Sequence, residues 1–292
     1  MSTATAALLE QLDLERLDRD LFRGVSPDEG RPRVFGGQVA AQSLVAAVRT
    51  VEGRMVHSLH SYFLRPGDPK VPIIYEVDRI RDGRTFATRR VVAVQNGEAI
   101  FNMAASFQIE EEGFEHHVEM PEVPPPESVP SNAERIRQAR EHADHPIFRW
   151  LSKLDRPIVI HDTDPIDPVH PTVRTGPHRV WFKSDGGLPD DPILHRCVLT
   201  YASDMTLLGA SLAQHGLTWF DPTLQVASLD HAIWFHRDFR ADEWLLYSTE
   251  SESTSGARGL NFGRIFTRDG RLVASVAQEN LMRQRPVEGS TL

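Results

Sequence analysis

The chain has 292 residues, of which 25% are charged and 40% are hydrophobic. This composition is typical of a folded globular protein and argues against long disordered segments. Acidic residues outnumber basic residues, 41 to 32, and the formal net charge is -9. Nucleic acid is therefore not expected as a partner, because its phosphates are bound by basic surfaces.

Cysteine usage and the ends of the chain bear on the compartment. Cys197 is the only cysteine, so a disulfide within the chain is impossible. The first residues lack the pattern of a secretory leader, and no apolar run approaches the roughly 18 residues of a membrane span. We therefore expect a cytoplasmic protein without a membrane span.

The first half contains one helix pattern followed by four strand patterns. Between Phe35 and Val51, apolar residues recur at helical spacing among alanines. Strand-like runs follow at Val56 to Leu64, Val71 to Ile80, Thr85 to Gln95 and Ala99 to Ile109. Glycine-containing turn signals such as Asn96-Gly97 separate these runs and indicate antiparallel hairpins.

Residues 114–178 differ from the rest in being rich in proline, histidine and aspartate, and they are predicted to form a linker with one short helix from Ser131 to Ala143. Five side chains of metal-binding type lie close together in this segment: His161, Asp162, Asp164, Asp167 and His170. Prolines interrupt the stretch and no zinc spacing occurs, so no metal is expected.

The second half repeats the order of the first. A helix is predicted from Leu194 to His215, and Cys197 lies on its apolar stripe, so this thiol is expected in the core rather than at a reacting centre. Strands are predicted at Gln225 to His236, Trp244 to Ser253, Arg258 to Thr267 and Arg271 to Met282.

Short stretches also correspond between the halves. Ser58-Leu59-His60 corresponds to Ser228-Leu229-Asp230 at an offset of 170 residues, and Gly97 corresponds to Gly270 at an offset of 173. Shared turn glycines would occur in any two antiparallel meanders, but the common order favours duplication. We predict an α+β fold of two similar antiparallel sheets, each wrapped around one helix. The predicted domains are residues 1–113 and 179–292, joined by the 114–178 linker.

Common hydrolase and cofactor motifs are missing. The sequence has no Gly-x-Ser-x-Gly elbow, no phosphate-binding Gly-x-x-x-x-Gly-Lys-Ser/Thr loop, no Gly-x-Gly-x-x-Gly after a strand and no His-Glu-x-x-His. Covalent serine catalysis, nucleotide hydrolysis, dinucleotide redox chemistry and zinc hydrolysis therefore lose support. No cofactor is expected.

Three polar residues occupy positions where a core residue is expected. Asp204 borders the apolar stripe of the second helix, and Gln278 shares a strand face with apolar residues. Ser228 begins the strand after the helix and is predicted to share a face with Asp230. Each could be a satisfied structural polar group. Together, an acid, a hydroxyl and an amide could deprotonate and position a water molecule.

Several long stretches resemble the type II acyl-CoA thioesterases, the TesB family, over nearly the whole chain. The matching stretches are Arg33 to Gln38, Val56 to Asp68, Ala104 to Gln108, Tyr201 to Asp204, Leu229 to Arg237 and Asp269 to Ser275. The resemblance implies two fused hotdog domains and a catalytic trio of Asp204, Ser228 and Gln278, with serine where a family member has threonine. Ala105 aligns with Gln278, so one competent site per chain is expected.

The family activity implied is hydrolysis of acyl-CoA by a water that Asp204 deprotonates and that Ser228 and Gln278 orient, with backbone N–H groups at a helix N-terminus receiving the oxyanion. Substrate-binding candidates are His57, His60, Arg84 and Arg258, and the arginines considered for the CoA phosphates also include Arg89, Arg90 and Arg264. A homo-oligomer is expected.

Two alternatives remain open at this point. Hotdog scaffolds also host acyl-CoA hydratases and dehydratases, which would be expected to carry histidine beside the aspartate on the helix. Here the first histidine after Asp204 is His215, about three helical turns away. A non-catalytic acyl-CoA-binding module is the second alternative.

Overall fold

The computed structural model describes residues 2–27, 32–142 and 156–285. Met1 and residues 286–292, at the outer ends of the two predicted domains, lie outside these ranges. The first half contains α1 (Thr3–Leu12), β1 (Glu15–Asp18), β2 (Leu21–Gly24), α2 (Gly36–Val48), β3 (Met55–Phe63), β4 (Ile73–Asp82), β5 (Phe86–Gln95) and β6 (Glu98–Gln108). The helix and four strands predicted for this half are confirmed, and each strand end falls within two residues of its predicted position.

The rest of the chain contains a 3-10 helix (Pro126–Ser128), α3 (Asn132–His142), β7 (Ile158–Asp162), β8 (His178–Ser184), α5 (Pro192–Ser203), α6 (Leu208–Ala213), β9 (Leu224–Ser228), β10 (Asp230–Phe235), β11 (Leu245–Ser255), β12 (Arg258–Thr267) and β13 (Leu272–Gln284). The short helix predicted in the linker is confirmed as α3, although Ala143 at its predicted end lies outside the described residues. Strand β7 also lies inside the predicted linker and pairs with β8.

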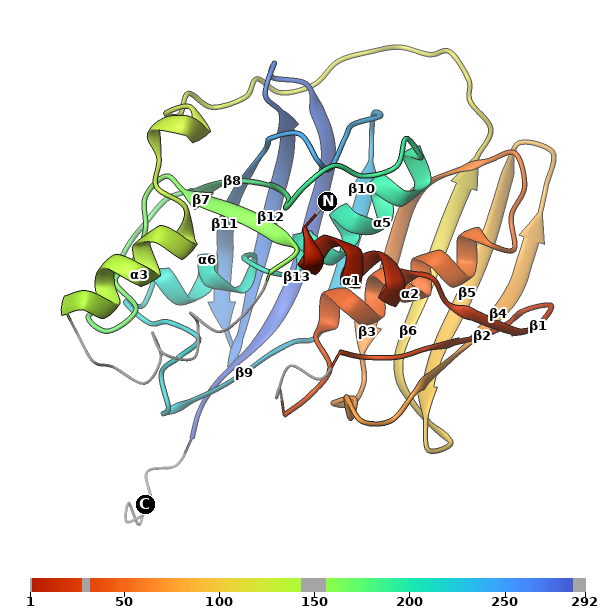
Figure 1. The fold of residues 1–292 in the computed structure, drawn as a ribbon, viewed down its shortest axis with the longest axis horizontal. Coiled ribbons are helices and arrows are strands. Elements are labelled where there is room, and N and C mark those ends of the chain that lie inside the picture. The colour runs from red at the N-terminus through yellow and green to blue at the C-terminus, as the bar shows by residue number, and fades with distance from the viewer. Residues whose placement is uncertain (1, 28–31, 143–155, 286–292) are drawn as a thin grey trace.

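The strands form one sheet in the order β1-β2-β4-β5-β6-β3-β10-β13-β12-β11-β8-β7, with β9 paired to β13 (Figure 1). Outward from the central pair β3 and β10, the two sides follow the same order, which confirms the duplication. The two predicted sheets are joined at this pair, where His60 lies opposite Ala232 and Ser58 opposite Trp234. Strands β1, β2, β7 and β8, which were not predicted, extend the sheet at its two ends.

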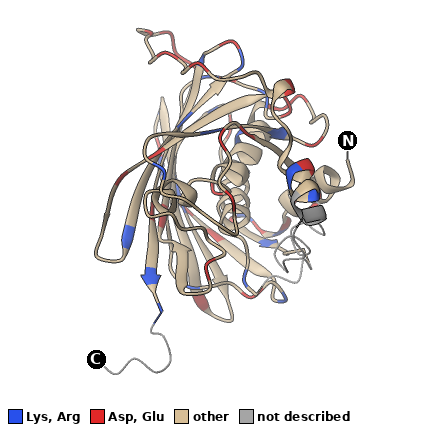
Figure 2. Ribbon diagram, turned by 90° about the vertical axis from the view of Figure 1, so that its left-hand side faces the viewer, with Lys and Arg blue, Asp and Glu red and all other residues tan. Residues whose placement is uncertain are grey.

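The sheet curves around the helices, as the view in Figure 2 shows. Helix α2 packs on strands β3 to β6 and against α5, and α6 packs on β11, β12 and β13. Alanines and glycines on α2 let its backbone approach its neighbours closely. Among the described ranges, no helix is long and apolar enough to cross a membrane.

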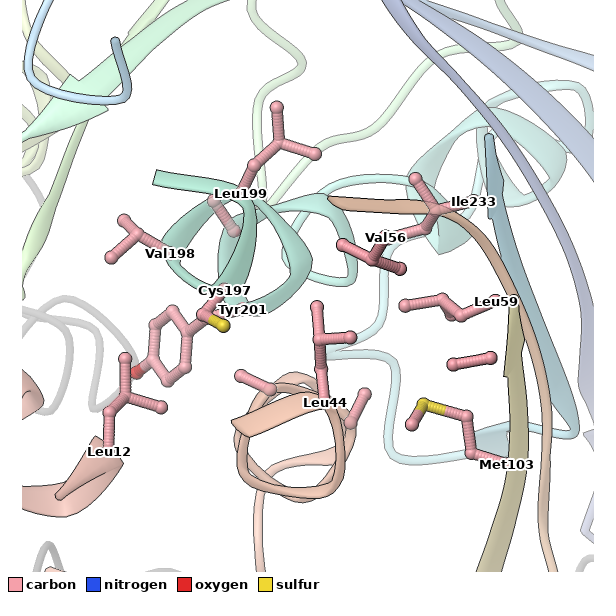
Figure 3. Close-up of a cluster of buried hydrophobic side chains, with 14 of the residues drawn as sticks. Leu12, Leu44, Val56, Leu59, Met103, Cys197, Val198, Leu199, Tyr201 and Ile233 are labelled. Carbon is pink, nitrogen blue, oxygen red and sulfur yellow. The ribbon is translucent and has the colours of Figure 1, made fainter. Parts of the chain in front are cut away.

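The core between the helices and the sheet contains Cys197 (Figure 3). Its side chain lies in this cluster near Leu44 of α2 and Tyr201 of α5, and it is 1% exposed. Burial raises the pKa of the thiol to about 12, which keeps it protonated and unreactive at neutral pH. The prediction that Cys197 is a core residue is confirmed.

The single helix predicted from Leu194 to His215 is wrong, because the chain breaks into α5 and α6 at Asp204. A carboxylate is unfavourable at the C-terminal end of a helix and favourable at an N-terminal end. The break places the Asp204 side chain at the first turn of α2. It also lets α5 pack on α2 while α6 covers the strands of the second half.

A β-bulge at Leu229 divides the strand predicted from Gln225 to His236. Ser228 pairs with Asn280, and Ala232 pairs with Ala277. The chain therefore advances four residues from Ser228 to Ala232 while β13 advances three, so the segment between β9 and β10 contains one extra residue. The bulge reverses the alternation of side chains beyond Ser228. The predicted common face of Ser228 and Asp230 is therefore wrong: Ser228 turns to the interior, while Asp230 accepts the backbone N–H of Glu279.

Several acidic and histidine side chains of the linker form hydrogen bonds within the protein. His178 Nε2 lies 2.8 Å from Asp162 Oδ1, and His161 Nδ1 lies 2.7 Å from the carbonyl oxygen of Pro126. The Asp167 carboxylate accepts backbone N–H groups of its own turn. Within the described part of the chain, no three His, Cys, Asp or Glu side chains are grouped closely enough to hold a metal ion.

Candidate active site

Asp204, Ser228 and Gln278 lie together on the inner side of the sheet. Asp204 follows the last turn of α5, Ser228 is the last residue of β9, and Gln278 lies within β13. The hydroxyl of Ser228 donates to Asp204 Oδ1 at 3.0 Å, and Gln278 Nε2 donates to Ser228 Oγ at 3.0 Å. The three side chains therefore form a continuous chain of hydrogen bonds that ends on a carboxylate.

The Asp204 carboxylate is 9% exposed and lies at the N-terminus of α2. No side chain caps this helix, because its N-cap residue is Phe35. A Cβ atom on Gly36 would lie 2.7 Å from Asp204 Oδ2, so only glycine leaves room for the carboxylate at this turn. The first half of the chain thus completes the environment of an acid that the second half supplies.

The pKa of Asp204 is raised, chiefly because burial disfavours the charged carboxylate. His231, the hydrogen bonds from Ser228 and Gln278 and the backbone N–H of Gly37 oppose this effect and lower the pKa. A carboxylate with a raised pKa is a stronger base than an exposed one, which suits it to accept a proton at neutral pH.

His231 and Asn280 bind Gln278 from two sides, and neither was identified from the sequence. His231 Nδ1 hydrogen-bonds to Gln278 Oε1, and Gln278 Nε2 donates to Asn280 Oδ1 at 2.7 Å. All three are fully buried. The two-residue spacing of Gln278 and Asn280 on one strand could have indicated Asn280, but His231 faces the interior only because of the bulge at Leu229.

A row of buried polar side chains crosses the inner face of the sheet beside the trio. Asn261 lies opposite Gln278 on β12, and Ser61 lies opposite His231 on β3. Asn261 Oδ1 and Asn280 Nδ2 have no hydrogen-bond partner among the described residues. Each unpaired buried group costs about 1 to 3 kcal/mol. Such concentrated polarity in an apolar core is typical of a functional site.

The structure does not bring the predicted substrate-binding residues to the trio. His60 stacks edge-on against Trp234 at 5.1 Å on the outer side of the sheet, and His57 Nε2 lies 2.8 Å from Ser106 Oγ. Arg258 pairs with Glu279 at 2.8 Å. Among the described residues, no hydrogen bond joins these three residues or Arg84 to the trio, and their roles in binding stay predictions.

Two other arginines differ in their access to a ligand. Arg89, considered above for the CoA phosphates, is 1% exposed and donates to Thr50 and Asp82, so it cannot reach a ligand at the surface. Arg33 was not considered. It is exposed, lines a small pocket with Phe35 and Tyr201 over the start of α2, and is the one basic residue in the lining of that pocket.

The strand order and the two helices inside the curved sheet define a double hotdog protein. A protein of unknown function with a hot dog fold from Alicyclobacillus acidocaldarius has the same architecture, at 21% identity and a TM-score of 0.76 over 96% of this chain and 99% of that chain. At this level of identity the likeness concerns the fold alone.

The chain belongs to the acyl-CoA thioesterase family. The family model for the acyl-CoA thioesterase N-terminal domain matches residues 26–108, and the acyl-CoA thioesterase model matches residues 159–281. Acyl-CoA thioesterase 2 of Haemophilus influenzae is 38% identical over 97% of this chain and 99% of its own length. The crystal structure of acyl-CoA thioesterase II TesB2 from Mycobacterium marinum is 45% identical, with a TM-score of 0.78 over 97% of this chain and 100% of that chain.

The contact between α2 and α5 predicts a sharp difference between two glycines in helices. A Cβ atom on Gly37 would collide with the backbone carbonyl of Tyr201, whereas one on Gly209 in α6 would meet open space. Gly37→Ala should lower the free energy of unfolding by about 1 to 3 kcal/mol through overpacking. Gly209→Ala should be neutral or slightly stabilising. Urea denaturation measures both, and equal stabilities would show that the helices are not in close contact.

Proposed function

We propose that this protein hydrolyses acyl-CoA thioesters to a carboxylic acid and CoA, with water as the nucleophile and Asp204 as the general base. The observation that carries the proposal is the hydrogen-bonded chain of Gln278, Ser228 and Asp204. It ends on a buried carboxylate with a raised pKa in a member of the acyl-CoA thioesterase family.

In this mechanism the Asp204 carboxylate accepts a proton as the water oxygen bonds to the thioester carbonyl carbon. The N–H groups in the first turn of α2 are suited to stabilise the developing oxyanion. They have no acceptor within the helix, they point out of its N-terminal end, and they carry the positive partial charge of the helix dipole. When the tetrahedral intermediate collapses, the C–S bond breaks and the proton passes from Asp204 to the leaving sulfur. CoA leaves as the free thiol.

The hydrogen bonds assign different tasks to Ser228 and Gln278. Both N–H groups of Gln278 are already donated, one to Ser228 Oγ and one to Asn280 Oδ1. Gln278 therefore orients Ser228, and it also lies close enough to Asp204 to lower the pKa of that carboxyl group. Ser228 contacts Asp204 directly and is the hydroxyl available to position the water.

The two alternative functions receive less support. A hydratase or dehydratase would need a second acid–base group facing the substrate, but the histidine nearest to the trio, His231, is fully buried and bonded to Gln278 and Ser203. A module that only binds acyl-CoA would not need a buried carboxylate with a raised pKa, because such a group opposes folding and adds nothing to affinity.

We further propose that the protein is cytoplasmic, that residues 1–113 and 179–292 are its two domains, and that it is a homo-oligomer. Tyr62, Trp234 and Phe262 are 59%, 37% and 38% exposed on the outer face of the sheet. An exposed aromatic group on a sheet face is suited to pack against a second copy of the chain.

The oligomer proposal predicts a mass of at least two chains in light scattering after gel filtration. Trp234→Asp should reduce this mass, because an unpaired charge opposes burial of the face. Phe114→Asp is the control, because Phe114 is also exposed but lies outside the sheet. A single-chain mass for the wild type would contradict the proposal.

Release of free thiol from an acyl-CoA, followed with a thiol reagent, tests the proposed activity. Wild-type protein should release thiol, and Asp204→Asn should lower kcat by at least about 10²- to 10⁴-fold, because the amide cannot accept a proton. The variant should keep the wild-type circular dichroism spectrum, since the substitution is nearly isosteric. An Asn variant with substantial turnover would show that Asp204 is not the base.

The pH dependence of kcat/KM tests the role of Ser228. Activity requires ionised Asp204, so it should be lost as pH falls through the raised pKa of this carboxyl group. Ser228→Ala removes a hydrogen bond that lowers this pKa, so the acid limb should move to higher pH and the rate should fall about 5- to 150-fold. Ser228→Thr is the control and should resemble wild type. A burst of CoA before steady turnover would instead indicate an acylated Ser228.

A further inference from the structure

We infer that His231 and Asn280 are positioning residues for the reaction, because they hold the Gln278 carboxamide from opposite ends and thereby orient Ser228 toward Asp204. The inference rests on the proposed function, since it concerns the same site. Neither residue touches the reacting atoms in this arrangement. Both act through Gln278.

The protonation of His231 follows from its partners. Gln278 Oε1 has no proton to give, so His231 Nδ1 must carry the hydrogen that joins them. Burial lowers the pKa of His231, which favours the neutral ring. Nε2 of a neutral ring with hydrogen on Nδ1 is an acceptor, so it receives the single proton of the Ser203 hydroxyl, which lies 2.8 Å from Nε2 and 3.0 Å from the carbonyl oxygen of Thr200. Ser203 and Gln278 therefore bind the ring on both sides and fix one tautomer.

Asn280 fixes the other end of the carboxamide. Its Oδ1 accepts one N–H of Gln278 at 2.7 Å, while Ser228 Oγ accepts the other at 3.0 Å. Turning the carboxamide over would place Oε1 against Asn280 Oδ1 and Nε2 against the Nδ1–H group of His231. Two hydrogen bonds would become repulsive contacts unless His231 changed its tautomer and the Asn280 carboxamide turned over as well, so the three side chains hold one orientation together.

The orientation of Gln278 determines the direction of the Ser228 hydroxyl proton. Ser228 Oγ accepts from Gln278, so its single proton is donated to Asp204 Oδ1. If Gln278 presented its carbonyl oxygen instead, the serine proton would turn to that oxygen and Asp204 would lose a hydrogen bond. The hydroxyl would then be misplaced relative to the carboxylate, and kcat would fall although the substrate pocket is unchanged.

Asparagine and glutamine at position 231 form a matched pair of variants. The pair separates the effect of the hydrogen bond to Gln278 from the effect of losing the buried histidine ring. The side-chain nitrogen of Asn overlays histidine Nδ1 and can still donate to Gln278, whereas that of Gln overlays Nε2 and reaches only Ser203. We expect His231→Asn to keep most of the wild-type kcat and His231→Gln to lose about 10- to 100-fold, with KM near the wild-type value for both. Thermal unfolding midpoints of the two variants should be similar, because both replace a buried ring with an amide.

A second pair tests the other end without altering His231. Asn280 and Gln95 are both buried carboxamides, but only Asn280 binds Gln278; the Gln95 amide donates to the carbonyl groups of Asp68 and Val71 in the first half of the chain. Asn280→Ala should lower kcat about 5- to 50-fold, while Gln95→Ala should lose stability with kcat retained. If the position 231 variants fail to fold, this second pair still tests whether the contacts to Gln278 are needed for the reaction.

The outcomes are distinct. If the wild type releases thiol, equal kcat values for His231→Asn and His231→Gln, or for Asn280→Ala and Gln95→Ala, would overturn this inference and leave the proposed function standing. Wild-type protein that releases no thiol from acyl-CoA would overturn the proposed function and this inference with it. A loss confined to His231→Gln and Asn280→Ala supports both.

Discussion

The Asp204 carboxylate lies between the two halves of the chain, with little water to solvate it, and most features of the surrounding structure accommodate this one buried charge. The break between α5 and α6 directs the side chain toward α2. Glycine at the start of α2 leaves room for a carboxylate oxygen where any other residue would place a Cβ atom. The hydroxyl of Ser228 and the N–H of Gly37 then lower the pKa that burial raises. The site therefore needs both halves of the duplicated fold, although the trio itself comes from one.

The β-bulge at Leu229 is the second constraint on the site. A regular strand would turn Ser228 and His231 to opposite faces, because side chains alternate along a strand. One extra residue turns both inward, where each hydrogen-bonds to Gln278. Buried polar groups are costly singly, but they become tolerable when they satisfy one another. The network around Gln278 holds its side chains in a fixed geometry, which the proposed catalysis by a positioned water requires.

Much of the fold follows from local patterns. Helical spacing of apolar residues predicts α2, alternation and turn glycines predict the strands of both halves, and the stripe that contains Cys197 predicts its burial. Strands β1, β2 and β7, at the two ends of the sheet, could not be recognised from such patterns, because each has only four or five residues. The trio was found through polar residues at core positions together with the family resemblance. Arg258 was predicted as a cation for the CoA phosphates, with His57 and His60 as further substrate-binding candidates, and the structure places the contacts of all three away from the trio.

The sequence by itself determined most of the element types and the duplication, because these depend on residue type and on short-range spacing, and it named Asp204, Ser228 and Gln278 as candidates. Only the tertiary structure decided how the halves meet through β3 and β10, where the second helix breaks, and that His231 and Asn280 hold Gln278. These features depend on pairing between residues distant in the chain, and on a one-residue change in register between β9 and β10 that reverses which face a side chain occupies. The spacing of residues along the chain does not reveal that register, because the register is fixed by pairing with the neighbouring strand β13.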